Sequence, residues 1–361
     1  MIKVLFDHQC FCEEYGGVSR VFSEILKTKS DEVEYKLALK YSNNAYLGDF
    51  GFSATNLLKK INIPKKHHII SFLNIKNTLN ILNNYNPDIF QLTHYNPYIF
   101  NTKINAITVS TIHDLNFWAI PQFYSSKTNI LKNWQVECSN KSDKIITISE
   151  TSKKDLIKYL NIDEKKIHVI YHGLDFSFTK SYEPRLVNNP YILFVGRRSK
   201  YKNFLNVLKA FAIVKKKFVD LKLICTGFDF DKKEKLILQD LNLLNEVNII
   251  KASETELVNL YSNAELFIYP SYYEGFGLPL LESMGCNCPV VCSDIEVFHE
   301  IAGNAACYFN PNNIDEIAER FIFILKDSNY RNELINTGIE RCKSFSWEKT
   351  RNEYINFYKN L

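Results

Sequence analysis

Short runs of β-branched and aromatic residues alternate along the chain with longer segments whose apolar positions recur at helical spacing. The short runs predict strands, and the segments between them, such as GVSRVFSEILK and ETSKKDLIKYL, predict amphipathic helices. In the first half of the chain the predicted strands cover residues 3–7, 34–39, 88–93, 107–112, 144–149 and 167–172. Strands that alternate with helices are typical of an α/β fold built on a parallel sheet.

The polar stretch 175–190, DFSFTKSYEPRLVNNP, interrupts this alternation, which then starts again. The second series of predicted strands covers residues 191–196, 221–227, 247–250, 265–270, 289–293 and 307–310. Because 361 residues exceed the size at which one hydrophobic core usually keeps growing, the two series predict two similarly built domains. We place the domains at residues 1–183 and 184–344, facing one another across a cleft.

The last segment, 345–361, has an apolar stripe at helical spacing. The stripe consists of Phe345, Trp347, Tyr354, Phe357, Tyr358 and Leu361. We expect this segment to be a helix that covers hydrophobic core, and it could cross back over the first domain.

Composition and charge narrow the class of protein. With 46% hydrophobic residues and a net charge of only +4, the chain shows neither disorder nor a nucleic-acid signature. The nine cysteines occur singly or in apolar runs, so we expect reduced thiols in a cytoplasmic protein. No apolar window approaches the length that spans a bilayer, so any membrane contact is expected to be peripheral.

One segment departs from this balance of charge. Residues 51–80 contain five lysines and two adjacent histidines but no acidic residue. This segment is either an ordinary solvated surface or a site that faces anionic lipid or a phosphorylated acceptor.

The segment YPSYYEGFGLPLLESMG, 269–285, follows a predicted strand and begins a predicted helix. Gly275 and Gly277 allow a ligand to approach the backbone, and Pro279 suits the first turn of a helix. A helix that begins at such a turn favours a phosphate at its N-terminus. The dinucleotide fingerprint G-x-G-x-x-G fails here because its third position is Leu280, and no Walker-type loop occurs in the chain.

Two carboxylates in the same segment, Glu274 and Glu282, would repel a phosphate that touched them. Carboxylates instead accept strong hydrogen bonds from hydroxyl groups. A nucleoside diphosphate sugar has phosphates in the middle and hydroxyl groups on both sides, and it would satisfy the glycines and the acids together. The alternative is that Glu282 is a solvated helix residue and Glu274 a turn carboxylate.

Three more segments follow predicted strands, where a parallel sheet places its ligand groups. LFVGRRSKYKNF, 193–204, contains Arg197, Arg198, Lys200 and Lys202, which would neutralise a diphosphate or form an exposed basic turn.

The remaining two segments lie in the first half. EYGGVSRVFSEI, 14–25, contains Gly16, Gly17 and Arg20, which either approach a ligand or make a plain tight turn. STIHDLNFW, 110–118, contains His113, which either binds a sugar hydroxyl and assists proton movement or is a satisfied buried imidazole.

Taken together, these segments resemble the family 4 glycosyltransferases of the GT-B fold, and the resemblance spans nearly the whole chain. EGFGLPLLE is similar to the E-x7-E element of that family, VGRRSKYKN to its basic segment, and YGGVSR to its N-terminal glycine turn. TIHDL, IITISETSKKDL, VIYHGLD and FSWEKT resemble further family elements in the expected order.

The resemblance implies a role for each matching residue of the second domain. Arg197 and Lys202 would hold the donor's diphosphate and stabilise the leaving group, although the adjacent Arg198 leaves open which arginine does so. Glu274 would contact the transferred sugar and Glu282 the ribose hydroxyls. The segment from Gly275 through Phe276 and Gly277 to Leu278 would cradle the phosphates or the sugar.

In the first domain, the resemblance implies that Gly16 and Gly17 lie near the phosphates and His113 near the sugar and the acceptor. It also implies transfer with retention, without a metal and without a cofactor other than the nucleotide sugar as co-substrate. Asp229 and Asp231 form a D-x-D sequence, but we expect no metal role in that polar turn.

The family further suggests a hexose donor, with GDP-mannose as the best single choice, and a glycan or lipid-linked acceptor in surface-polysaccharide synthesis. Two other functions stay open at this point. One is a protein that binds a nucleotide sugar without transferring it, and the other is a nucleotide-sugar epimerase of the same fold.

Overall fold

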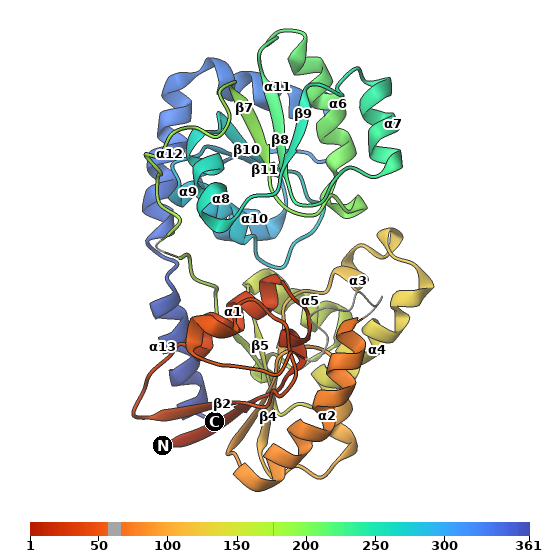
Figure 1. Cartoon of the computed structure of the whole chain (residues 1–361), viewed down its shortest axis with the longest axis vertical. Helices are drawn as coiled ribbons and strands as arrows, with labels where there is room; N and C mark the ends of the chain where they lie inside the picture. The colour runs from red at the N-terminus through yellow and green to blue at the C-terminus, as the bar shows by residue number, and fades with distance from the viewer. Residues whose placement is uncertain (57–65, 176) are drawn as a thin grey trace. The chain divides into compact units, whose positions relative to one another are not determined.

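The computed structural model describes residues 1–56, 66–175 and 177–361, and it divides into two compact units (Figure 1). The first unit consists of Met1–Trp118, Tyr124–Gly173 and Trp347–Leu361. The second consists of Leu174–Ser346 together with the short segment Ala119–Phe123. The units therefore change over after Gly173, whereas the sequence places the boundary after residue 183.

The first unit is built on a parallel sheet of six strands in the order β2-β1-β3-β4-β5-β6. The strands are β1 (Ile2–Phe6), β2 (Val33–Leu37), β3 (Ile89–Leu92), β4 (Ile107–Ile112), β5 (Lys144–Thr147) and β6 (Ile167–Val169). Each of them lies within or beside a run that the sequence predicts to be a strand, so the α/β prediction is confirmed for this unit.

Helices cover both faces of this sheet because successive strand residues point to opposite sides. On one face, Phe6 meets the ring of Phe22 from α1 (Gly17–Leu26) and the ring of Tyr358 from α13 (Trp347–Lys359). On the other face, Leu5 belongs to a core cluster with Leu82 from α2 (Lys66–Tyr85). The remaining longer helices are α4 (Asn129–Lys141) and α5 (Glu150–Leu160).

The helix α13 joins the first unit although it follows the whole of the second unit in sequence. The Tyr358 hydroxyl donates a hydrogen bond of 2.9 Å to Gln91 Oε1 in the central strand β3. Both side chains are fully buried or nearly so, and the Gln91 amide nitrogen donates to Thr111 Oγ1 at 3.0 Å. A hydrogen-bonded polar pair therefore fixes α13 on the middle of the sheet.

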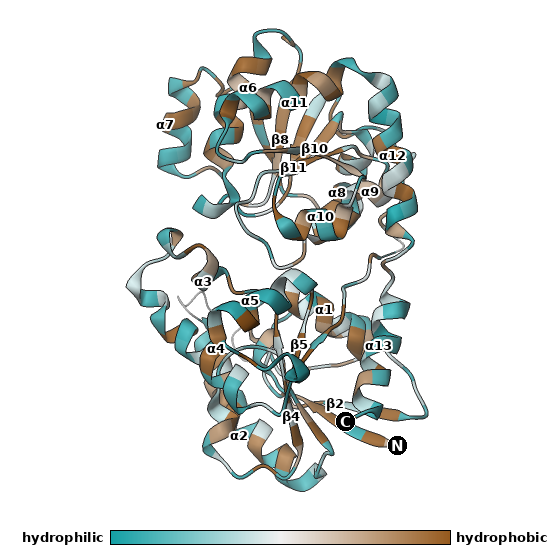
Figure 2. Ribbon diagram, turned by 180° about the vertical axis from the view of Figure 1, so that it is seen from behind, coloured by the Kyte–Doolittle hydropathy of each residue, from teal (hydrophilic) through white to brown (hydrophobic). Residues whose placement is uncertain are grey.

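The second unit repeats the same plan with a parallel sheet in the order β12-β11-β10-β7-β8-β9. The strands are β7 (Tyr191–Phe194), β8 (Lys222–Thr226), β9 (Val247–Ile250), β10 (Leu266–Tyr269), β11 (Val290–Ser293) and β12 (Ala306–Phe309). The strands of the second unit are predominantly hydrophobic (Figure 2), as expected where helices cover both faces of a parallel sheet. The prediction of a second α/β series is also confirmed.

Among the described residues of the second unit, α-helices lie around this sheet (Figure 1). They are α6 (Phe204–Lys215), α7 (Lys232–Asp240), α8 (Glu254–Asn263), α9 (Leu278–Gly285), α10 (Glu296–Ala302), α11 (Ile314–Lys326) and α12 (Ser328–Cys342). Within the residues that the structure describes, no helix is both long enough and apolar enough to cross a membrane.

Candidate active site

The predicted basic loop and the predicted glycine loop of the second unit follow neighbouring strands. β7 pairs with β10 in parallel, with Ile192 opposite Leu266, so the loops after both strands emerge at the same edge of the sheet. The backbone amide of Tyr272 donates to the carbonyl of Tyr201 at 2.9 Å and joins the two loops directly. The structure therefore brings together the two segments that the sequence singled out.

An ion pair between Lys202 and Glu274 lies where these loops meet. The Lys202 ammonium donates to Glu274 Oε1, and the Ser271 hydroxyl donates to the same oxygen at 2.6 Å. The side chains of Lys202 and Glu274 are only 18% and 13% exposed, so solvent screens the pair weakly. Sequence reasoning missed Ser271, whose only signal is its position three residues before Glu274.

The two consecutive arginines of the basic loop point to different surroundings. Arg198 is 6% exposed and pairs with Glu234 in the first turn of α7, with 2.7 Å between Nε and Oε1. Arg197 is exposed, and among the described residues no ion pair or hydrogen bond of its side chain is found. Arg197 is therefore the arginine of this pair that is available to a ligand.

The glycine loop passes into α9 through a backbone conformation that favours glycine. Gly277 caps the helix with φ of +111°, and a Cβ atom there would lie 3.1 Å from Leu280 Cδ1. Phe276 is 3% exposed and packs its ring against Phe345, so only the backbone of this residue is offered to a ligand. Pro279 stands in the first turn of the helix, as predicted.

Glu282 lies inside α9 and is 6% exposed, so the alternative that it is a solvated helix residue is wrong. The Tyr261 hydroxyl donates to Glu282 Oε2 at 3.2 Å. Burial, and next the nearby carboxylate, raise the pKa of Tyr261 well above its ordinary value, so the phenol remains a donor. A carboxylate has two oxygens that can each accept more than one hydrogen bond, so Glu282 can accept from a ligand hydroxyl in addition to Tyr261.

In the first unit, Gly16 and Gly17 begin α1 with ordinary backbone angles. Gly16 has φ of −176°, which is extended backbone that any residue adopts. A Cβ atom on Gly17 would meet no atom within 4 Å, and one on Gly16 would meet only Ser19 Oγ at 3.6 Å. Neither strain nor internal crowding requires these glycines, which favours the interpretation that they leave space for a ligand.

His113 follows β4 and is 7% exposed. Its Nε2 atom is buried and has no hydrogen-bond partner within residues 1–56, 66–175 and 177–361, so the alternative that this imidazole is fully satisfied is wrong for the described part of the chain. Burial, followed by the nearby His172 and His94, holds the pKa of His113 well below its ordinary value. His113 is therefore a neutral imidazole with one nitrogen that can exchange a hydrogen bond with a hydroxyl group.

The ring of His172 lies 6.1 Å from that of His113, centroid to centroid, and 6.0 Å from that of Trp347. Sequence reasoning did not select His172 as a site residue. Its signal was its position at the end of the last predicted strand of the first half, in VIYHGLD.

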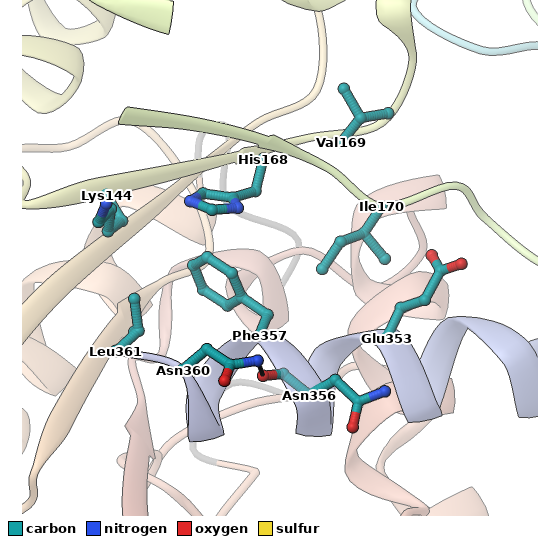
Figure 3. Close-up of a pocket in the computed structure, with 9 residues that line it drawn as sticks. All are labelled: Lys144, His168, Val169, Ile170, Glu353, Asn356, Phe357, Asn360 and Leu361. Atoms are coloured by element: carbon teal, nitrogen blue, oxygen red, sulfur yellow. Dashed lines mark hydrogen bonds between the residues drawn. The ribbon is translucent and has the colours of Figure 1, made fainter. Parts of the chain in front are cut away.

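A cavity of about 310 Å³ lies elsewhere in the first unit, between β6 and α13 (Figure 3). Figure 3 shows His168 and Phe357 side by side within it, with Glu353 at one end and Lys144 at the other. None of the predicted site residues lines this cavity, so it is distinct from the candidate active site.

Two family descriptions together match residues 37–341. Residues 177–341 match "Glycosyl transferases group 1" and residues 37–178 match "Glycosyltransferase Family 4". Both descriptions are of glycosyltransferases and they match successive parts of the chain, which is therefore a glycosyltransferase.

Among its relatives, the chain is similar to the O-antigen chain mannosyltransferase B of Escherichia coli, with 27% identity over 70% of both chains. It is also similar to the O-antigen chain mannosyltransferase RfbU of Salmonella typhimurium, with 32% identity over 56% of both chains.

Solved structures share the fold over the whole chain. Sucrose-phosphate synthase from Thermosynechococcus elongatus superimposes with a TM-score of 0.79 at 18% identity and covers 100% of this chain and 99% of its own. Anabaena HepE in complex with UDP and glucose gives a TM-score of 0.78 at 17% identity and covers 100% of both chains. The two parallel-sheet units are thus those of a GT-B glycosyltransferase, as the sequence predicts.

Proposed function

We propose that this chain is a retaining glycosyltransferase that moves a hexose from a nucleotide diphosphate sugar to a glycan or lipid-linked acceptor in surface-polysaccharide synthesis. The observation that carries the proposal is the Lys202–Glu274 pair, fixed by Ser271, at the sheet edge where the exposed Arg197 also lies. This arrangement offers cations for a diphosphate and a carboxylate for sugar hydroxyls within one set of loops.

Arg197 and Lys202 are proposed to stabilise the leaving group of the reaction, which is the nucleoside diphosphate. Breaking the bond at the anomeric carbon develops negative charge on the diphosphate, and groups that stabilise that charge in the transition state accelerate transfer. Arg197 can bind two phosphate oxygens at once, whereas Lys202 acts as a point charge. The N-terminus of α9 adds backbone donors and the positive end of the helix dipole.

The two carboxylates bind the two ends of the donor. Glu274 accepts hydrogen bonds from hydroxyl groups of the transferred sugar, while Ser271 holds its orientation. Glu282 accepts from ribose hydroxyls and keeps its hydrogen bond from Tyr261. Such charge-assisted hydrogen bonds are roughly twice as strong as neutral ones.

Retention is consistent with the absence of a strong base among these residues. His113 is neutral and buried, and it orients a sugar or acceptor hydroxyl rather than carrying a charge. A phosphate oxygen of the leaving group takes the acceptor proton on the face from which it departs. The acceptor oxygen then bonds to the anomeric carbon on that same face.

Mannose is the sugar that we propose, with GDP-mannose as donor, because the relatives named above are mannosyltransferases of O-antigen chains.

We also propose that the protein contacts the cytoplasmic face of a membrane peripherally. Residues 57–65 of the basic segment lie outside the described residues, but α2 continues it with Lys66 and Lys76. On this helix Ile69, Phe72 and Leu73 are 42%, 75% and 39% exposed. This helix has lysines but no acidic residue, and its exposed apolar side chains lie among them. Such a combination suits an anionic lipid surface, where a lipid-linked acceptor would be found.

The test is to incubate the full chain separately with GDP-mannose, UDP-glucose and UDP-N-acetylglucosamine, with methyl α-mannoside and α-mannobiose as acceptors. Mass spectrometry should show one sugar added to an acceptor, and NMR should show the anomeric configuration of the donor retained. Conversion of the donor without a change of mass would indicate an epimerase. Saturable nucleotide-sugar binding without turnover would indicate a binding protein, and an inverted product would refute retention.

A further inference from the structure

The side chain of Arg198 connects three parts of the second unit at the edge of the candidate active site. Nε donates to Glu234 Oε1 at 2.7 Å, and Nη2 donates to the carbonyl oxygens of Phe228 and Asp229 at 2.6 and 3.2 Å. Phe228 and Asp229 belong to the loop after β8, and Glu234 lies in α7. One buried guanidinium thus joins the loop after β7 to the loop and helix that follow β8.

Glu234 is itself held in place by the start of α7. Its Oε2 atom accepts a hydrogen bond of 2.9 Å from the Asp231 amide, and its own amide donates to Asp231 Oδ1 at 2.8 Å. This reciprocal pair is a capping box, which satisfies backbone donors that the first helical turn leaves open. Arg198 is therefore anchored to a carboxylate that cannot move without opening the helix terminus.

Two aromatic rings complete the surroundings of the guanidinium. Its central carbon lies 4.8 Å from the ring centroid of Phe230 and 5.7 Å from that of Phe204. The two rings are stacked with an interplanar angle of 15°. A planar guanidinium fits such a site, and a lysine ammonium could not make both the forked hydrogen bonds and the ring contacts.

Arg197 lies between Arg198 and a glycine whose backbone conformation favours that residue type. Gly196 adopts φ of +105°, and a Cβ atom on it would meet nothing within 4 Å. Its amide donates to Thr226 Oγ1 at 3.2 Å, and the exposed Arg197 follows directly. Because consecutive Cα atoms are about 3.8 Å apart, fixing Arg198 restricts where the backbone of Arg197 can lie.

We infer that Arg198 is a positioning residue that sets Arg197 for the diphosphate of the donor. The inference rests on the proposed function, in which Arg197 binds that diphosphate. With Arg198 in place, the loop is ordered before the ligand arrives, so binding does not have to supply that ordering free energy. The sequence left open which arginine binds the diphosphate, and the structure assigns the two arginines different tasks.

A double-mutant cycle tests this inference with GDP and UDP as probes, measured by calorimetry on the full chain. Arg198→Met should weaken binding of the preferred nucleoside diphosphate about tenfold in the wild-type background, the loss expected when one well-placed charged contact is disordered. In the Arg197→Ala background the same substitution should change affinity less than about twofold, because the residue it positions is gone.

Equal losses in both backgrounds would overturn the inference, because a general structural defect weakens binding whether or not Arg197 is present. Glu234→Gln supplies a milder second variant with the same expected pattern if Arg198→Met does not fold. Arg198→Lys should fail to restore affinity, and restoration by lysine would also overturn the inference. If Arg197→Ala alone leaves affinity unchanged, the proposed role of Arg197 fails instead, which is a separate outcome.

Discussion

Lys202 and Glu274 are 72 residues apart in the chain, and their side chains form an ion pair between the loops that follow β7 and β10. Each residue satisfies the charge of the other when no phosphate or sugar separates them. A donor that places its diphosphate near Lys202 and its sugar near Glu274 would break the ion pair. Lys202 would then pair with the diphosphate, and Glu274 would accept hydrogen bonds from the sugar. A bound donor therefore competes with the ion pair for both side chains.

Removing the charge of Glu274 should separate binding from transfer. Glu274→Gln keeps the shape of the side chain and an oxygen for Ser271, but it no longer competes with phosphate for Lys202. We expect the rate of sugar transfer to fall by roughly two orders of magnitude, because Glu274 would stabilise the transition state. Calorimetry should show nucleoside diphosphate affinity unchanged or tighter. Turnover at the wild-type rate would contradict the assignment.

Removing the charge of Lys202 should act in the opposite direction on binding. Lys202→Met is expected to weaken nucleoside diphosphate binding about tenfold or more and to lower kcat as well, because the same cation stabilises the leaving group. Lys200→Met is the matched control, since Lys200 is exposed in the same loop. Equal effects of the two substitutions would point to the general charge of the loop rather than to Lys202.

The buried carboxylate of Glu282 should report on the ribose of the nucleotide. The wild-type protein is expected to bind GDP or UDP about tenfold more tightly than the corresponding 2′-deoxynucleotide, because the deoxynucleotide lacks a hydroxyl that donates a charge-assisted hydrogen bond to the carboxylate. Glu282→Gln should reduce that preference, while Tyr261→Phe, which removes only the neighbouring donor, should largely keep it. The measurement is the ratio of the dissociation constants of the 2′-deoxynucleotide and the ribonucleotide for each variant. An unchanged ratio in Glu282→Gln would contradict the prediction.

Stability should fall in mild acid because of buried histidines in the first unit. Burial lowers the pKa of His8 and of His172, each to about 3, from the ordinary value of 6.5. Below pH 6.5 the unfolded chain binds protons that the folded chain does not, so stability declines as pH falls toward 3. At pH 5 the loss is about 2 kcal/mol for each histidine.

Thermal unfolding between pH 7 and pH 5 checks this slope. His8→Gln and His172→Gln should each flatten it, even if they lower stability at pH 7. Burial raises the pKa of Asp7, which acts with the opposite sign, so the histidine variants rather than the wild-type slope alone carry the test. An unchanged slope in both variants would show that these histidines do not control the acid response.

Contact with an anionic membrane should depend on the exposed apolar face of α2. Phe72→Ser is expected to reduce sedimentation of the protein with vesicles that contain phosphatidylglycerol, because it removes the most exposed apolar side chain of that face. Phe323→Ser is the matched control in α11, where the phenylalanine is 42% exposed. Neutral phosphatidylcholine vesicles should bind weakly in both cases, and equal binding of the variants would refute this surface.

The strands and the glycine turn into α9 could be predicted from the sequence because their signals are local. A buried parallel strand requires a short apolar run, and YPSYYEGFGLPLLESMG carries its glycines, proline and acids within one segment. What could not be predicted depends on contacts between distant residues. Arg198 and Glu234, for example, are 36 residues apart, and nothing in the basic loop distinguishes Arg198 from Arg197.

The change from one unit to the next shows the same limit. The polar stretch after Gly173 has the composition of a linker, but its residues form hydrogen bonds with α8 of the second unit. The Ser181 amide donates to Ser262 Oγ at 2.8 Å, and Arg185 donates to the carbonyl of Asn263 at 2.8 Å. Polarity alone does not reveal such partners, and this explains why the second unit begins earlier than the sequence suggested.

The hydrogen bond from Tyr358 to Gln91 has a consequence for how the protein is made. On the ribosome, β3 emerges early, but the helix that covers Gln91 is synthesised only after the entire second unit. The first unit therefore cannot complete its fold in the order of synthesis, although N-terminal domains generally fold first. A fragment that stops after residue 183 would leave Gln91 and the ring of Phe6 uncovered, so expression of the first unit alone requires residues 347–361 to be joined to it.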